Sequence, residues 1–419
     1  MEGKGNAKLG YKRGAIFIIL FMCWFSLSSV DMANALNGAD VAIYNDSIAP
    51  PGELGVWTDG VTAIKNMLTW MGLTYEEINY SDLNYSTQDF SSLYKVVLFP
   101  GGYAQWYNYW ISKSGKERIR NFVNDGGGYL GICAGAFFAS DRTVWEDVLY
   151  DDNAGYNAYD ELTGYDLDLF PGTATGPINE IADWDTEGYN MATFNFENEN
   201  AVLSHYKPTP YTEDILYYGG PYFSSDEGAD LEVLSTYGYN GQPAIVAFHY
   251  GSGRVVLSGP HPETEEDSSR DGVTLDREDE MDDNGSDWEL VLHILNWLMR
   301  VPSVATGSAT TVTYDSATLN GTVNPQGLST SYLFEYGTTA SYGSATTETD
   351  AGPGTEEVSA SAGVTGLNER TTYHFRLVAT NSGGTSYGDD ATFTTTTEPN
   401  GEGDEDGGSG CFVSTINGN

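Results

Sequence analysis

A thiol stands between glycines at the end of an apolar run, in the segment Gly127-Gly128-Tyr129-Leu130-Gly131-Ile132-Cys133-Ala134-Gly135-Ala136. This pattern predicts a nucleophile elbow, in which a strand turns sharply into a helix. Such a turn strains the backbone of its corner residue, so neighbours without side chains are needed, and Gly131 and Gly135 meet that need. The start of the following helix favours a thiolate over a thiol. Cys133 is therefore the candidate nucleophile.

A candidate base follows in the segment Ser258-Gly259-Pro260-His261-Pro262-Glu263. His261 and Glu263 stand two residues apart, which in an extended segment places both side chains on the same side. The carboxylate can then orient the imidazole and stabilise its protonated form. We therefore expect Cys133, His261 and Glu263 to form a catalytic triad.

A third element is the apolar run Val96-Val97-Leu98-Phe99, which is followed by Pro100-Gly101-Gly102. The run is typical of a buried strand, and glycine amides at its end can approach a ligand closely. Together with the amide of Ala134, the amides of Gly101 and Gly102 are predicted to form an oxyanion hole.

These three ordered motifs resemble the class I glutamine amidotransferase-like fold. Within that fold, the chain most resembles the domain at the N-terminus of eukaryotic biotin-protein ligases. The resemblance rests on the segments 126–135, 217–223 and 253–263, and extends from about Asp40 to Arg300. It implies Cys133 as nucleophile, His261 as base, Glu263 as its orienter, and Gly101, Gly102 and Ala134 as oxyanion donors. The continuation Ala134-Gly135-Ala136-Phe137-Phe138 differs from that of true amidotransferases, which argues against glutamine as the substrate.

Alternating strand and helix patterns predict an α/β domain over residues 36–300, with a flavodoxin-like, open and mostly parallel sheet. The expected strands and helices are 40–44, 61–71, 96–99, 114–123, 129–132, 244–249, 255–258 and 288–299. In such sheets ligands bind beyond the carboxyl ends of the strands, where Gly101, Cys133 and His261 would all fall. Tyr218, Gly219 and Gly220 follow another apolar stretch and are candidate substrate-binding residues, although a tight turn explains them equally well.

The second predicted domain, residues 301–397, is rich in Thr, Ser, Gly, Tyr and Val and alternates apolar with polar residues. It resembles a fibronectin type III-like, all-β sandwich, with Tyr373 as a candidate tyrosine corner. We expect it to present the first domain, through contact with a cell surface or matrix. The acidic, Gly-rich tail, residues 398–419, is expected to be disordered, and its Cys411 lies in a segment that resembles a short C-terminal sorting box.

Residues 1–35 predict a secretory signal peptide, because basic residues precede the apolar run 15–25 and Ala33-Asn34-Ala35 fits a cleavage site. We therefore expect a secreted or cell-surface protein. The apolar run is too short to cross a bilayer of about 30 Å comfortably, so no stable membrane span is expected. A formal charge of −42, from 18 Lys and Arg against 60 Asp and Glu, disfavours nucleic acid as a partner.

The sequence implies no cofactor, since we find no P-loop, dinucleotide fingerprint or zinc-type spacing. The acidic run 263–287 does not predict a calcium loop either, because the last ligand position would fall on Val291. Two function classes remain. One is a cysteine hydrolase that cleaves a small amide or a peptide through a thioester; the other is a non-catalytic binding or adhesion protein that retains the fold.

Overall fold

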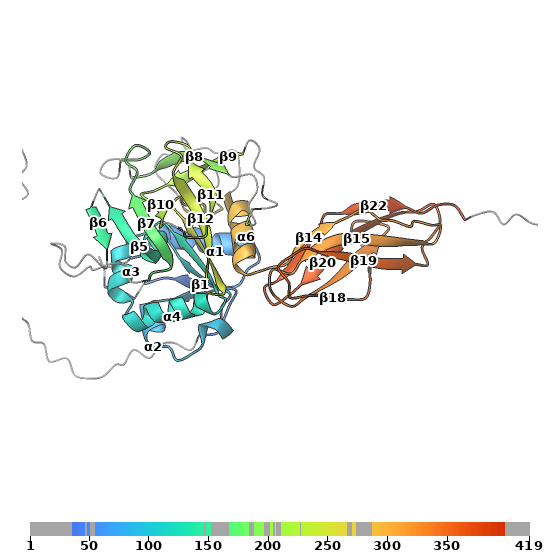
Figure 1. Ribbon diagram of the computed structural model, residues 1–419, viewed down its shortest axis with the longest axis horizontal. Helices are drawn as coiled ribbons and strands as arrows, with labels where there is room; N and C mark the ends of the chain where they lie inside the picture. The colour runs from blue at the N-terminus through green and yellow to red at the C-terminus, as the bar shows by residue number, and fades with distance from the viewer. Residues whose placement is uncertain are drawn as a thin grey trace, which may run out of the picture.

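The computed structural model describes residues 36–46, 48–50, 55–145, 148–151, 167–183, 188–196, 202–203, 206, 211–226, 228–265, 270–273 and 287–398. The expected signal peptide, the tail with Cys411 and most of the acidic run after Glu263 lie outside these residues. The described chain packs around two hydrophobic clusters, one between Leu36 and Val301 and the other between Ala317 and Phe393. Figure 1 shows them as two bodies that follow one another along the chain.

The first body is built on a nine-stranded sheet. Its strands, in spatial order, are β2 (Tyr75–Ile78), β1 (Val41–Tyr44), β3 (Val96–Phe99), β4 (Gly128–Ile132), β13 (Gly253–Ser258), β12 (Pro243–Tyr250), β11 (Leu231–Tyr237), β8 (Asn190–Phe196) and β9 (Thr212–Tyr217). A separate four-stranded sheet has the order β10 (Tyr222–Ser225), β7 (Phe170–Gly176), β5 (Ser140–Trp145) and β6 (Val148–Asp151).

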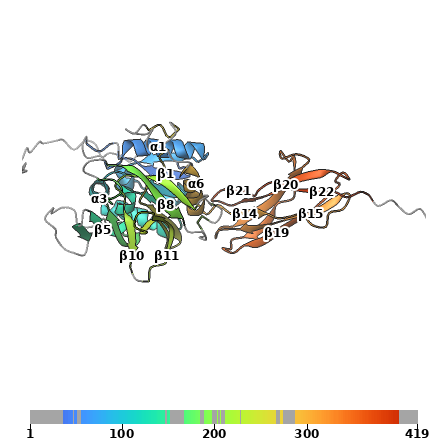
Figure 2. The same ribbon diagram turned by 90° about the horizontal axis from the view of Figure 1, so that it is seen from above.

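The helices of this body are short to medium in length. They are α1 (Thr58–Trp70), α2 (Tyr80–Tyr85), a 3₁₀ turn (Phe90–Ser92), α3 (Ala104–Trp110), α4 (Lys113–Asn124), α5 (Ala134–Ala139) and α6 (Asp287–Leu298). The apolar face expected for α1 is confirmed, because Val61, Ile64, Met67 and Leu68 are all buried. Figure 2 shows α1 along one side of this body, and Trp70 of α1 contacts Trp288 of α6 with ring centroids 5.8 Å apart.

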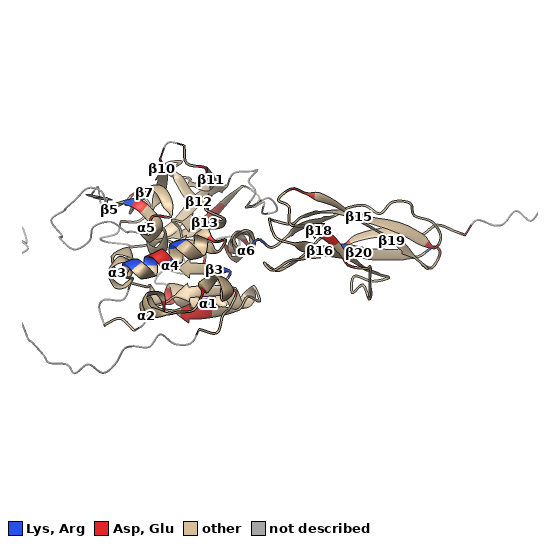
Figure 3. Ribbon diagram, turned by 60° about the horizontal axis from the view of Figure 1, so that its bottom comes forward, with Lys and Arg blue, Asp and Glu red and all other residues tan. Residues whose placement is uncertain are grey.

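Basic residues are concentrated on α4, which carries blue segments in Figure 3, although the chain as a whole is strongly acidic. Arg118 of α4 donates hydrogen bonds to the carbonyls of Asp82, Leu83 and Ser86, at the end of α2. Because the last carbonyls of a helix lack partners within it, a guanidinium there satisfies them and holds α2 against α4.

The sheet is mixed, whereas the sequence predicted a mostly parallel one. Strands β2, β1, β3, β4 and β13 are parallel to their neighbours within this half, while every pairing from β13 through β12, β11 and β8 to β9 is antiparallel. The reason is the short turn at Gly251 and Ser252, which joins β12 directly to β13 and so allows only a hairpin. A parallel connection would need a crossover of a dozen or more residues.

The predicted strands at the centre of the sheet are confirmed, and they bring the residues of the three motifs together in space. Strands β3, β4 and β13 are adjacent and parallel, with Phe99 beside Gly131 and Ser258 beside Ile132. Their carboxyl ends therefore lie at the same edge, and the segments that follow them begin side by side.

The second body contains only strands among its described residues. One sheet has the order β14 (Ser303–Thr306), β15 (Ser316–Asn324) and β19 (Val358–Thr365). The other has the order β17 (Ser344–Ala345), β16 (Thr330–Gly337), β20 (Thr372–Thr380) and β21 (Thr385–Tyr387), with β18 (Thr349–Gly352) paired to β16 and β22 (Ala391–Thr394) paired to β20. The hydroxyl of Tyr373 accepts a hydrogen bond from the amide of Asn368 at 3.0 Å.

Among the described residues, polar contacts join the two bodies. Arg254 of β13 donates to the side chain of Gln326 at 3.1 Å, and Lys95 donates to the carbonyl of Gly383 at 3.0 Å. Asn381 donates to the carbonyl of Arg300 at 2.9 Å, directly after α6. Within the part of the chain that the structure describes, no helix is both long and apolar enough to cross a membrane.

The close packing at Gly135 predicts that a larger residue there will lower the free energy of unfolding. A Cβ at Gly135 would lie 2.2 Å from the carbonyl oxygen of Phe99, so Gly135→Ala must displace β3 or α5. We expect a loss of about 1–3 kcal/mol in the free energy of unfolding, measured by urea denaturation with near-ultraviolet circular dichroism. Gly363→Ala is the control, because a Cβ there would meet no atom within 4 Å. Equal stability of the two variants would contradict the close approach.

Candidate active site

Cys133 occupies a strained corner between β4 and α5, with φ 48° and ψ −103°. A positive φ is uncommon for a residue with a side chain, so the turn itself fixes this position. The neighbouring glycines are needed for a different reason than the one inferred from sequence. A Cβ at Gly131 would lie 2.6 Å from the carbonyl oxygen of Gly135, so the glycines allow the backbone to pack closely.

The thiol of Cys133 is nearly enclosed, with 6% of the residue exposed. Its amide donates to the carbonyl of Ser258 at 2.8 Å, which ties the elbow to the end of β13. Its sulfur donates to the carbonyl of Tyr218 at 3.4 Å. The helix that follows has only six residues, so its contribution to the charge state of the sulfur is that of a single short turn.

His261 and Glu263 form a buried pair, with 1% and 0% of their side chains exposed. Nδ1 of His261 lies 2.9 Å from Oε1 of Glu263, as expected from their spacing in the sequence. The backbone amide of His261 donates to the carbonyl of Leu216 at 2.8 Å, which anchors the segment to the end of β9. Because Glu263 occupies Nδ1, Nε2 is the nitrogen left to exchange a proton with a reactant.

The two partners of His261 favour its protonated form. Burial alone lowers the pKa of His261, but the charges of Glu263 and Cys133 oppose burial more strongly, so the pKa rises from 6.5 to about 10. Nε2 makes no hydrogen bond in the structure, so Cys133 contributes to this rise through the charge of its thiolate form. The arrangement therefore stabilises an imidazolium beside the sulfur.

Glu263 is held from two further sides. The indole of Trp288, in α6, donates to the backbone carbonyl of Glu263 at 2.9 Å. Gly60, in the first turn of α1, lies close enough that a Cβ there would be 3.4 Å from Oε1 of Glu263. Neither Trp288 nor Gly60 was found from the sequence, because nothing in the local pattern relates α1 or α6 to the segment after β13.

Of the three predicted oxyanion donors, the structure brings two to the Cys133 and His261 site. Ala134 follows Cys133 directly, and Gly101 packs against the imidazole so closely that a Cβ would lie 2.4 Å from Cε1 of His261. Gly102 instead pairs with Val56 across an isolated bridge. Among the described residues, we find no partner for the amides of Gly101, Gly102 and Ala134. Of these, the N–H groups of Gly101 and Ala134 lie at the site and are available to an incoming oxyanion.

The predicted substrate-binding residues separate into two roles. Tyr218 lies beside the thiol, because its carbonyl accepts the hydrogen bond from the sulfur of Cys133. Its ring centroid lies 6.0 Å from that of His261. Gly219 has φ 67°, a conformation that favours glycine. Gly220 packs on Gly259, where a Cβ would lie 1.8 Å from the carbonyl oxygen, and so serves the close approach of two backbone segments.

Trp57 also lines this site and was missed by the sequence analysis. Its ring stands edge-on to His261, with centroids 5.3 Å apart and planes at 86°. The amide of Trp57 donates to the carbonyl of Gly101 at 2.8 Å, which brings the start of α1 to the end of β3. A single tryptophan before an amphipathic helix gives no sequence signal for such a role.

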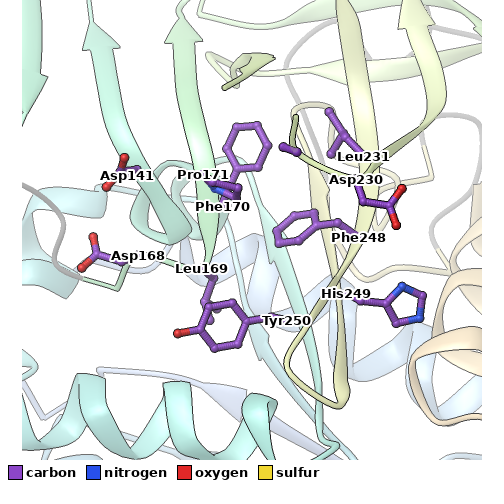
Figure 4. A pocket seen from close by; sticks show the side chains of 11 residues that line it. Asp141, Asp168, Leu169, Phe170, Pro171, Asp230, Leu231, Phe248, His249 and Tyr250 are labelled. Atoms are coloured by element: carbon purple, nitrogen blue, oxygen red, sulfur yellow. The ribbon is translucent and has the colours of Figure 1, made fainter. Parts of the chain in front are cut away.

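A separate cavity of about 280 Å³ lies where β7 approaches the end of β12 (Figure 4). Its lining includes Phe170 and Phe248, with Asp141, Asp168 and Asp230 around it, and none of the triad. Among the described residues, no group of three or more His, Cys, Asp or Glu side chains is placed to hold a metal ion.

A buried Cys after β4 and a buried His and Glu after the adjacent parallel strand β13 define a cysteine-centred site on an α/β sheet. The family comparison then identifies the first body. Residues 55–291 match the family model "Biotin-protein ligase, N terminal", and the chain belongs to this family.

Two curated relatives share part of the chain. One is an uncharacterized protein of Chlamydia muridarum, 32% identical over 40% of this chain and 60% of its own length. The other is the biotin-protein ligase of Schizosaccharomyces pombe, 28% identical over 49% of this chain and 30% of its own length. The chain thus spans less than two thirds of either relative. Among solved structures, the beta-galactosidase from Bacillus circulans sp. alkalophilus matches 79% of this chain and 40% of its own, with 14% identity and a TM-score of 0.36.

The opposite environments of two histidines lead to a pH prediction. The pKa of His261 is raised to about 10, whereas burial and then the charge of Arg254 lower the pKa of His249 below 6.5. In nuclear magnetic resonance titrations of ¹³C-labelled histidine, we expect the Cε1 signal of His261, identified by its loss in His261→Gln, to titrate far above that of His249. A His261 signal that titrates near 6.5 would contradict the ion pair.

The raised pKa of His261 also makes the free energy of unfolding depend on pH. A pKa raised on folding contributes stability that is fully present below the unfolded value, near 6.5, and is lost as the pH rises through about 10. We therefore expect Glu263→Gln to lower the free energy of unfolding more at pH 6 than at pH 10, in urea titrations at both values. An equal loss at the two pH values would show that the pair is not charged.

Proposed function

We propose that this protein is a cysteine-dependent amide hydrolase that acts through a thioester intermediate. The observation that carries the proposal is the arrangement of Cys133, His261 and Glu263 at one edge of the sheet, with the amides of Gly101 and Ala134 beside them. Each group in this arrangement has a defined part in acyl transfer.

In the proposed reaction, the sulfur of Cys133 attacks the carbonyl carbon of the amide, and the carbonyl oxygen becomes an oxyanion. The amides of Ala134 and Gly101 donate hydrogen bonds to this oxyanion, and each such donor contributes on the order of 3 kcal/mol to stabilising the transition state. His261 holds its proton at Nε2 because of its raised pKa, and transfers it to the leaving amine as the C–N bond breaks. Water then attacks the thioester, with His261 as base, and releases the acid.

The remaining features of the proposal concern the fold and location. We infer a class I glutamine amidotransferase-like, flavodoxin-like first domain over residues 36–300, supported by the parallel half of the sheet. We infer a fibronectin type III-like sandwich over residues 301–397, supported by the bond from Asn368 to Tyr373, which has the form of a tyrosine corner. A secreted or cell-surface location, with this second domain as the presenting unit, follows from the expected signal peptide.

The second candidate function is a non-catalytic binding protein that retains the family architecture. The observation that favours it is the enclosure of the triad, since Cys133 is 6% exposed and Nε2 of His261 has no hydrogen-bond partner. In this alternative, Cys133 acts as a small apolar residue and the buried pair serves only to fix the segment after β13.

Trapping of an acyl-enzyme distinguishes the two functions. Incubation with p-nitrophenyl acetate should add one acetyl group to Cys133, detected by intact mass and peptide mapping, together with a burst of nitrophenol. We expect Cys133→Ala to abolish the adduct and His261→Gln to slow its formation by about 10²–10⁴-fold, because proton transfer and thiolate stabilisation are lost.

The control for this experiment is Ser258→Ala, which removes a hydroxyl that donates to the nearby carbonyl of Pro260 and leaves the triad side chains intact. It should retain the adduct. Acetylation at the same rate in wild type and His261→Gln would support the binding protein instead.

A further inference from the structure

Four aromatic side chains, Trp57, Tyr103, Tyr189 and Tyr218, gather beside the thiol, and we call them the aromatic collar. The ring of Tyr218 stands edge-on to Trp57 at 5.4 Å and to Tyr189 at 5.8 Å. Tyr103 joins this group through the backbone, because its amide donates to the carbonyl of Gly55, two residues before Trp57. Burial raises the pKa of Tyr218, and the charges that Tyr103, Cys133 and Tyr189 can carry raise it further. The collar therefore comes from four separate segments of the chain.

Trp57 is held in the collar by its backbone. The carboxylate of Asp46, which is fully buried, accepts from the amide of Gly55 at 2.6 Å and from that of Val56 at 3.4 Å. The amide of Tyr103 donates to the carbonyl of Gly55 at 2.6 Å, so the segment before α1 is fixed to the segment after β3. A ring carried on so constrained a backbone is preorganised for contact with a flat partner.

The collar retains surface for a ligand. Tyr103 is 53% exposed, and Trp57, Tyr189 and Tyr218 are partly exposed, although they lie beside a nearly enclosed sulfur. Core aromatic residues would instead bury their faces against one another, as Tyr44 and Phe99 do at 4.7 Å in the sheet interior. Partly exposed rings at right angles offer both faces and edges, which is the surface that aromatic groups prefer to contact.

We propose that the aromatic collar selects amides that carry an uncharged aromatic ring near the reacting carbonyl. This proposal rests on the proposed hydrolase function for its reaction, but the recognition itself requires only that an electrophile reach Cys133. Trp57 is the main specificity-determining residue, since it contacts both His261 and Tyr218. Tyr189 extends the collar on the far side of Tyr218.

The test uses two iodoacetamides of similar size and apolar character, N-benzyl-iodoacetamide and N-cyclohexylmethyl-iodoacetamide, on the full chain. In both reactions the sulfur displaces iodide, so the ratio of the two alkylation rates cancels the general reactivity of the thiol. We expect the benzyl compound to alkylate Cys133 about tenfold faster in the wild type, the scale of an aromatic pair beyond burial alone. Intact mass gives the rates, and peptide mapping confirms the site.

The variants separate recognition from folding. Trp57→Leu should bring the ratio close to one, Trp57→Phe should preserve most of it, and Tyr189→Leu should lower it partly while leaving the backbone at Trp57 unchanged. Trp110→Leu is the matched control, because the ring of Trp110 stacks on Tyr80 of α2, and it should keep the wild-type ratio.

A ratio near one in the wild type, or a tenfold ratio that neither Trp57→Leu nor Tyr189→Leu lowers, would overturn the proposal. The outcome is independent of the proposed hydrolase function, because the ratio can be high in a protein that never forms an acyl-enzyme. A high ratio without acetylation by p-nitrophenyl acetate would retain the aromatic collar as a binding surface and reject the hydrolase.

Discussion

The hydrogen bond between His261 and Glu263 is the interaction on which the site depends. Two ionisable groups are withdrawn from water here, which is costly unless each is well paired. The hydrogen bond between the two side chains, at 2.9 Å, and the charges of Glu263 and Cys133 offset the cost of burying His261. For this reason the pKa of His261 is raised and not lowered. Removing one partner would leave the other as an isolated buried charge, so the pair constrains both the local structure and the chemistry.

Hydrogen bonds from the surrounding elements hold His261 and Glu263 in a fixed position relative to Cys133. The carbonyl of Leu216 fixes the backbone of His261, Trp288 fixes that of Glu263, and Ser258 fixes that of Cys133. Gly101 then closes the assembly, since no larger residue would fit against the imidazole. The site is thus built from the ends of β3, β4, β9 and β13, together with α1 and α6. Neither of these helices carries one of the sequence motifs.

Much of the central geometry could be predicted from the sequence because parallel strands bring distant motifs to one edge. The bounds of β3 and the positions of Cys133, His261 and Glu263 follow from short apolar runs that end in glycine or proline. The contributions of Trp57, Trp288 and Asp46 could not be predicted, because each depends on contacts between segments with no shared pattern. The antiparallel half of the sheet was missed for a related reason, since β8, β9 and β11 are only partly buried and alternate weakly.

The central proposal is that His261, oriented by Glu263, activates Cys133 as a nucleophile, and the most direct measurement is the pH dependence of Cys133 alkylation by unsubstituted iodoacetamide. The account predicts fast alkylation through neutral pH in the wild type and slow alkylation in His261→Gln, which rises only as the solution becomes alkaline. Superimposable profiles for wild type and His261→Gln, both rising only in alkaline solution, would contradict it.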